Sequence, residues 1–100
     1  MEMIETLLRQ AVLGKNLVEF YYEGGTKVIE PHMVAHNMMG HILLSGWFVD
    51  GDRKFAEEGW QDYMLADISQ LKILPETFGE ARFGYNPLDS NKFANIQFCL

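Results

Sequence analysis

The residues with the clearest capacity for chemistry are three histidines and one cysteine, namely His32, His36, His41 and Cys99. Imidazole and thiolate groups are ligands that zinc prefers. Their spacing matches no zinc pattern, because the chain has neither a Cys-x-x-Cys pair nor a His-Glu-x-x-His segment. We therefore expect no metal and no cofactor. His32 is predicted in a turn beside Pro31, His36 in a loop and His41 at the start of a strand.

Nucleophilic catalysis needs a nucleophile, a base and a group that orients the base. Ser45 lies inside an apolar run, and Ser69 and Ser90 have no base near them in the sequence. The acidic segment 50–58 lacks the alternating ligands and closing glutamate of a calcium loop. These residues predict a protein that is not an enzyme.

Four large aromatic residues form the most informative set, and they are Tyr22, Trp47, Trp60 and Tyr63. They predict either a packed core or a pocket in which aromatic faces stack on a ligand ring. Both interpretations stay open, because binding pockets are mostly apolar with a few polar groups. The polar residues expected to line such a pocket are His32, His41 and Gln61.

The apolar run from His41 to Val49 predicts a buried central strand, around which the other elements are organised. Helical spacing of apolar residues predicts a helix over residues 1–14, with Gly14 as its cap. Period-two alternation predicts a strand over residues 17–23, a turn at Gly24-Gly25 and a return strand over residues 26–32. Pro31 is expected to end the pairing or to lie at an edge.

Two short strands are predicted after a surface loop over residues 50–59, one over residues 60–65 and one over residues 68–74 that Pro75 stops. An irregular segment follows over residues 76–90. Residues 92–100 alternate again, and they predict a final strand or an arm that pairs with a partner chain. The residues expected on one face of that strand are Ala94, Ile96, Phe98 and Leu100.

These elements predict a single domain over residues 1–100. The fold class is mainly β with an N-terminal helix (residues 1–14), a small SH3-like or Sm-like five-stranded barrel (residues 17–75) and a C-terminal extension (residues 76–100). The helix is expected to cover an open end of the barrel.

The composition of the chain limits the classes of partner that we expect it to bind. The formal net charge of −6 disfavours nucleic acid, whose affinity comes largely from Lys and Arg contacts with phosphates. A single cysteine cannot form an internal disulfide, and no apolar run approaches the roughly 20 residues of a membrane span. We therefore expect a cytoplasmic protein that does not bind membranes.

The chain resembles the WYL domain family in its small stand-alone form, from about Leu7 to Phe93. The segments that carry the resemblance are Phe20-Tyr21-Tyr22-Glu23-Gly24, Val28-Ile29-Glu30-Pro31-His32, Leu43, Gly59-Trp60 with Tyr63, Leu65 and Ile68, and the tail with Phe78, Arg82, Gly84-Tyr85-Asn86-Pro87 and Asp89. The name-giving Trp-Tyr-Leu triad is replaced by His41-Ile42-Leu43. Gln61 and Asp67 stand where the family usually has two arginines.

The resemblance implies a ligand-sensing or regulatory binding module that takes a small molecule or nucleotide-like ligand by aromatic stacking and a few hydrogen bonds. Its expected site residues are Tyr22, His32, His41, Leu43, Trp47, Trp60, Gln61 and Tyr63. The alternatives are a protein-interaction or homodimerisation module that uses residues 91–100 and a Met-rich loop, and an Sm-like RNA-binding domain. The lost arginines and the acidic charge oppose the RNA alternative.

Overall fold

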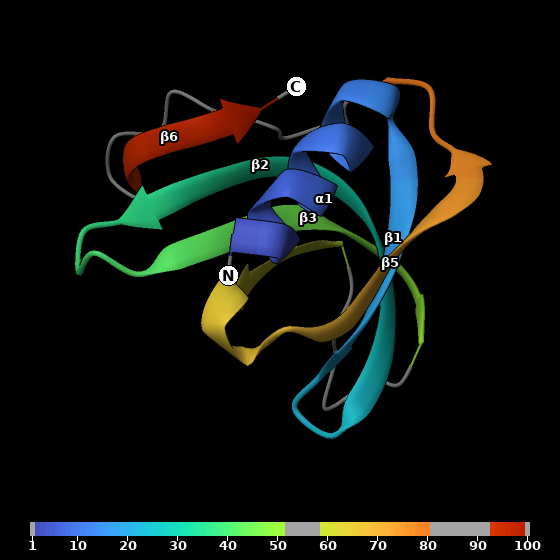
Figure 1. Cartoon of the computed structure of the whole chain (residues 1–100), viewed down its shortest axis with the longest axis horizontal. Helices are drawn as coiled ribbons and strands as arrows, with labels where there is room; N and C mark the ends of the chain where they lie inside the picture. The colour runs from blue at the N-terminus through green and yellow to red at the C-terminus, as the bar shows by residue number, and fades with distance from the viewer. Residues whose placement is uncertain (1, 52–58, 81–92, 100) are drawn as a thin grey trace.

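The chain folds as a helix packed on one antiparallel sheet. The computed structural model describes residues 2–51, 59–80 and 93–99. Its elements are α1 (Glu2–Gly14), β1 (Asn16–Tyr22), β2 (Gly25–Asn37), β3 (Ile42–Gly51), β4 (Trp60–Met64), the 3₁₀ turn η1 (Leu65–Asp67), β5 (Ser69–Thr77) and β6 (Phe93–Cys99). Figure 1 shows α1 lying across one face of the sheet. Among the described residues, no helix is long and apolar enough to cross a membrane.

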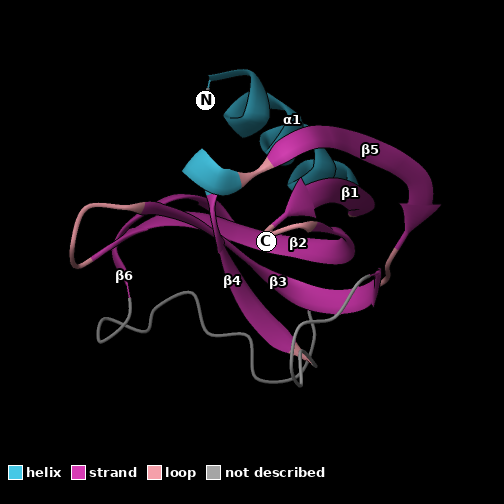
Figure 2. Cartoon of the chain, turned by 90° about the horizontal axis from the view of Figure 1, so that it is seen from below, coloured by secondary structure: helices cyan, strands magenta, loops and turns pink. Residues whose placement is uncertain are grey.

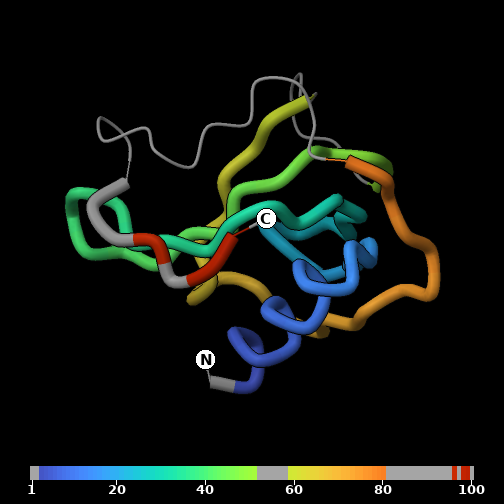
Figure 3. Tube along the Cα trace, turned by 90° about the horizontal axis from the view of Figure 1, so that it is seen from above, coloured from blue at the N-terminus to red at the C-terminus, as the bar shows by residue number. Residues whose placement is uncertain are grey.

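Helix α1 is held by its apolar stripe. A helix of 13 residues is marginal alone, so docking must supply its stability. Leu8, Ala11 and Val12 are at most 2% exposed, and the helix contacts β1, β2 and β5 (Figure 3). Burying a leucine side chain contributes about 1.5–3 kcal/mol. The left-handed residue that ends the helix is Lys15, with φ 54°, and not Gly14 as predicted.

Strand β2 is the central strand of the sheet, and it is longer than predicted. It pairs with β3 along most of its length. On its other edge, residues 25–29 of β2 pair with β1, and residues 33–37 of β2 pair with β6. Pro31 lies between those two segments, where its missing N–H removes no bond to either neighbour. The predicted end of pairing at Pro31 is therefore wrong, because the proline sits where the edge changes partner.

The β2–β3 ladder contains a bulge that determines the positions of His32 and Gly46. Pro31 pairs with Gly46 and Met33 with Ser45, so His32 is the extra residue on β2. A Cβ atom at Gly46 would lie 2.6 Å from the Glu30 carbonyl oxygen, which only a glycine avoids. The two strands thus approach each other closely at this bulge.

The expected five-stranded barrel is corrected to an open, six-stranded sheet. The strand order is β4-β3-β2-β1-β5, with β6 pairing beside β2, and β4 does not pair with β5. These two outer strands are consecutive in the chain and are joined through the three residues of η1 (Figure 2). Because a residue spans at most about 3.6 Å, this short link brings the two edges together at one corner. The sheet is therefore rolled without being closed.

The core lies on the inner face of the rolled sheet, beneath α1. Its buried members are Leu8, Ala11, Val18, Phe20, Tyr22, Ile29, Val34, Leu44, Phe48, Tyr63, Leu65 and Ile68. A smaller cluster on the other side of the sheet contains Met33 and Ala35, with Leu43, Ile96 and Cys99 against it.

The two C-terminal strands differ from their predictions in detail. The final strand exists as β6, and it pairs with β2 of its own chain. Its register shifts between the pairs made by Ile96 and Phe98, so Phe98 packs on the main core while Ile96 packs on the smaller cluster. The predicted common face is wrong for these two residues, because a bulge reverses the alternation.

Strand β5 continues through Pro75 to Thr77, where a stop was predicted. Proline is tolerated there because β5 is the last strand of the pairing path. Residues 52–58 of the predicted surface loop and residues 81–90 of the predicted irregular segment lie outside the described residues.

Candidate functional site

The predicted site residues do not form one site. The structure places two tyrosines in the core, a histidine and two tryptophans in an outer aromatic cluster, and His41 at the end of the β2–β3 hairpin. Gln61 and Leu43 lie between these places. Gln61 is half-buried on β4 opposite Gly46, and Leu43 packs on the smaller cluster.

Tyr22 and Tyr63 are core residues. Their ring centroids are 5.0 Å apart at an interplanar angle of 88°, and Phe20 lies 5.1 Å from Tyr63 at 77°. Edge-to-face pairs of this kind add about 0.5–1.5 kcal/mol beyond the burial itself. The Tyr22 hydroxyl accepts a hydrogen bond of 3.1 Å from the N–H of Met64, which ties β4 to β1 across the core. The two rings are packed in the interior, where both are buried.

His32, Trp47 and Trp60 come together in an outer aromatic cluster completed by Phe78. The His32 ring lies 4.7 Å from Trp60 and stacks on Phe78 at 5.2 Å, and Trp60 meets Trp47 edge-on at 5.7 Å. Phe78 was not predicted as a site residue. Its N–H donates to the carbonyl of Lys15, a long-range contact that no local pattern indicates.

His32 is held rigidly in that cluster. It is fully buried, and its Nδ1 lies 2.8 Å from the Glu30 carbonyl oxygen. A carbonyl only accepts, so Nδ1 carries a proton. The bulge in β2 positions this ring, since the extra residue turns its side chain out of the ladder. The outer aromatic cluster is thus a packed structural unit with one oriented imidazole.

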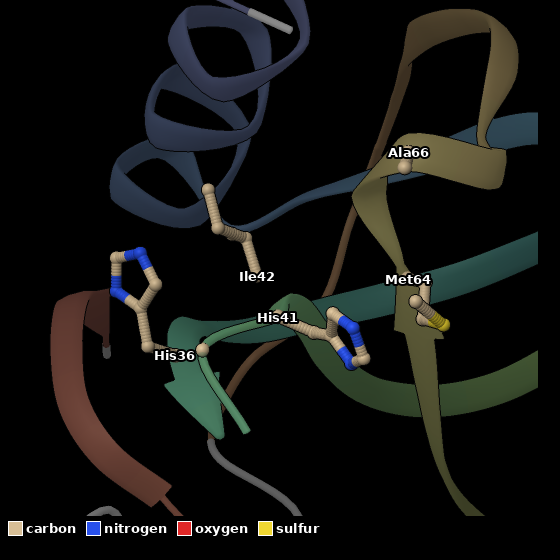
Figure 4. A pocket seen from close by; sticks show the side chains of 6 residues that line it. His36, His41, Ile42, Met64 and Ala66 are labelled. Atoms are coloured by element: carbon tan, nitrogen blue, oxygen red, sulfur yellow. The ribbon is translucent and has the colours of Figure 1, made fainter. Parts of the chain in front are cut away.

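A pocket of ≈ 200 Å³ lies elsewhere, at the end of the β3–β4 ladder. It is lined by His36, Gly40, His41, Ile42, Met64 and Ala66 (Figure 4). The last pair of that ladder is Leu43 with Met64, and two further residues in the same register would place His41 opposite Ala66. The 3₁₀ turn η1 begins at Leu65 and carries Ala66 away from the ladder. The pocket opens where this pairing stops.

The two imidazoles enter the pocket differently. In Figure 4 the His41 side chain points toward Met64, whereas the His36 ring lies on the β6 side of the hairpin. His36 is in register with Ile42 on β3 and with Asn95 on β6. His41 is exposed and His36 half-buried, so His41 is the residue best placed to meet a ligand.

The turn that carries His41 is braced by Asn37. The Asn37 Oδ1 accepts hydrogen bonds from the N–H groups of Met39 and His41, each 2.9 Å long. The Asn37 N–H donates to the His41 carbonyl at 2.9 Å, and Gly40 takes φ +83°, which favours glycine. A side chain that satisfies its own turn fixes the turn geometry. The side chain of His41 therefore projects from a backbone position that the turn fixes.

Of the six lining residues, His41 was predicted as a site residue and the other five were not. His36 was assigned to a loop, and Ile42 to the buried strand. The interruption of the ladder by η1 has no recognisable signal, because Leu-Ala-Asp also continues a short strand. Only the family alignment, which set His41-Ile42-Leu43 at the triad, pointed to this corner.

The chemistry available in the pocket is hydrogen bonding and apolar contact. A neutral imidazole offers one donor and one acceptor, and Ile42, Met64 and Ala66 offer apolar walls. Within the part of the chain that the structure describes, no three His, Cys, Asp or Glu side chains gather to hold a metal ion. Comparison with models of known families, with curated proteins and with solved structures found no match to this chain.

Proposed function

We propose that the protein is a non-enzymatic binding module of the WYL type, which senses a small ligand in the pocket beside His41. The observation that carries the proposal is the position of the pocket. It contains His41 and Ile42, two residues of the segment that the resemblance aligns with the family triad. A binding pocket is normally apolar with a few placed polar groups, which describes this lining.

The fold supports the same assignment. An N-terminal helix followed by an antiparallel sheet agrees with the mainly β fold that the resemblance implies, although the sheet is open. Its outer strands β4 and β5 are joined through the 3₁₀ turn η1. The pocket lies at the corner where those strands come together.

Binding at this corner can be transmitted. The lining comes from the β2–β3 hairpin on one side and from β4 and η1 on the other. A ligand that contacts both sides links two segments whose pairing has stopped, and it favours the arrangement in which they are closest. The signal is then a change in the mobility of the hairpin, which a regulatory partner can detect.

The test uses the three histidines of the chain as reporters. We expect a fragment screen by thermal unfolding to give hits, because a ligand at 100 times its Kd adds about 2.7 kcal/mol, or several degrees for a domain of this size. In spectra of the imidazole groups, the hits should move the signals of His36 and His41. His32 is buried outside the pocket and is the internal control.

Two outcomes would reject the proposal. The first is a screen in which no fragment stabilises the protein. The second is a set of hits that move the His32 signal and leave His36 and His41 unchanged, which would place binding at the outer aromatic cluster.

A second candidate function is self-association, favoured by the tip of the same hairpin. Met38 and Met39 are 59% and 80% exposed, and flexible thioether side chains are common at interaction surfaces. If the tip forms a homodimer, light scattering should show a dimer that the double change Met38→Ser and Met39→Ser dissociates. Met3→Ser is the control, because Met3 is 76% exposed on α1. A monomer at all concentrations would remove this candidate.

A further inference from the structure

We infer that the ligand of the pocket beside His41 is a neutral, planar heteroaromatic ring of about nucleobase size that carries no phosphate. This inference rests on the proposed function and specifies its ligand class. Three properties of the pocket support it, namely its volume, the charge of its lining and the chemistry of its side chains.

The volume limits the ligand to one ring system. Pockets for drug-sized ligands usually measure about 300–1,000 Å³. This pocket measures ≈ 200 Å³ and is partly open to solvent through the exposed His41, Gly40 and Ala66. A mononucleotide or a dinucleotide would leave most of its surface outside. A single fused or substituted ring can be largely enclosed.

The charge of the lining disfavours an anion. None of the six residues that line the pocket is a lysine or an arginine, and these are the side chains that bind phosphate well. The whole chain carries a formal net charge of −6, which repels anionic ligands further.

The side chains match a flat ring. The imidazole of His41 offers a face for stacking, as histidine does for nucleobases in other proteins. Figure 4 shows His41 pointing toward Met64 across the pocket, and a thioether sulfur makes favourable contacts with aromatic rings. A ring between His41 and Met64 would therefore have contacts on both sides.

The His41 imidazole matches the edge of a heterocycle. The backbone of His41 is already bonded within its own turn, because its N–H donates to Asn37 Oδ1 and its carbonyl accepts from the Asn37 N–H. The exposed imidazole offers one donor and one acceptor in its neutral form, and a ring edge that carries both a donor and an acceptor can bond to either of them. An aliphatic ligand has no such edge, which separates the inferred class from a purely hydrophobic one.

The experiment compares four probes on the wild-type protein, namely adenine, adenosine, adenosine monophosphate and cyclohexanol. Imidazole spectra and calorimetry report binding. We expect adenine to move the His41 signal with the lowest Kd of the four, and the monophosphate to bind at least ten-fold more weakly. Equal or tighter binding of the monophosphate, or of cyclohexanol, would overturn the inference and leave the proposed function intact.

If no probe moves the His36 or His41 signal, the heteroaromatic class is rejected, and the fragment screen alone decides the proposed function. Two variants locate the site. Ala66→Phe fills the pocket and should abolish the adenine response. Met39→Phe adds a ring to the same hairpin outside the lining, so it should leave the response unchanged. Both variants retaining the adenine response would also overturn the inference.

Discussion

The outer aromatic cluster and the pocket beside His41 were both expected to contribute to one site, yet they are built in opposite ways. In the cluster, His32 contacts both Trp60 and Phe78 beside the β2–β3 ladder, which continues past the bulge at His32. At the pocket, pairing between β3 and β4 has ended, and η1 moves Ala66 away from His41. The rings of the cluster fill the space between the strands, whereas the end of the β3–β4 ladder leaves a cavity.

This difference concerns how a small sheet makes a binding site. Regular antiparallel pairing places side chains opposite each other at about 4.5–5.5 Å, a spacing that large rings fill completely. Aromatic residues in register, such as Trp47 and Trp60, are therefore expected to pack on each other. A cavity needs a place where one strand leaves the ladder. In this chain that place is the start of η1.

The largest effect is expected in the core. Tyr63 is 1% exposed and meets Phe20 and Tyr22 edge-on, so Tyr63→Ala should lower the free energy of unfolding by about 3–5 kcal/mol. Urea denaturation followed by tryptophan fluorescence measures it. The matched control is Tyr21→Ala, since Tyr21 is 43% exposed, and its effect should stay near 0.5 kcal/mol. Similar losses in both variants would mean that the Tyr63 rings do not form the core.

A smaller loss is expected at the close approach of β2 and β3. Gly46→Ala places a Cβ atom 2.6 Å from the Glu30 carbonyl oxygen and 2.9 Å from the Ile29 Cδ1, so the strands must separate. We expect a destabilisation of about 1–3 kcal/mol in urea. Gly79→Ala is the control, because no atom lies within 4 Å of its added Cβ. If Gly46→Ala left the free energy of unfolding unchanged, the bulge at His32 would adapt to the added Cβ atom without cost.

Sequence patterns predicted most of the elements but less of the site, for a physical reason. Helical and two-residue periodicities report which face of an element is buried, and α1 and β1 followed them. Contacts such as Phe78 on His32 depend on how distant segments meet, and no local pattern records that. The same limit explains why the sheet was expected to close, since closure depends on whether β4 and β5 pair and not on their own residues.

Of the six residues that line the pocket, only His41 was predicted as a site residue. The resemblance to the WYL family sets His41 at the triad position, whereas Met64 and Ala66 join it through the geometry of η1. The bulges at His32 and Gln97 were also unpredicted, because an extra residue in a strand looks like ordinary sequence. Bulges reverse the alternation on which the assignment of faces depends, which accounts for the error at Ile96 and Phe98.

The brace at the hairpin connects stability with the site. Asn37→Ala removes the acceptor of two N–H groups, and we expect a loss of about 1 kcal/mol in urea. The imidazole signal of His41 should shift in the same variant, while that of the distant His32 stays in place. Asn37→Asp retains a side-chain oxygen acceptor, so it should restore most of the stability and the His41 signal. If Asp behaved like Ala, the side-chain oxygen would not be what holds the turn.

The smallest effect on stability, and the sharpest contrast with Tyr63, is expected at His41. Its side chain is exposed and belongs to neither core cluster, so His41→Ala should change the free energy of unfolding by less than about 0.5 kcal/mol. The same variant should lose the stabilisation by fragments that the wild type shows, because the ring is the group best placed to meet them. Thermal unfolding with and without the hits measures both quantities on one sample. A residue of a binding site should matter for binding and not for folding. A His41→Ala protein that is strongly destabilised, or that keeps the full response to fragments, would therefore remove the distinction between the pocket and the packed outer aromatic cluster.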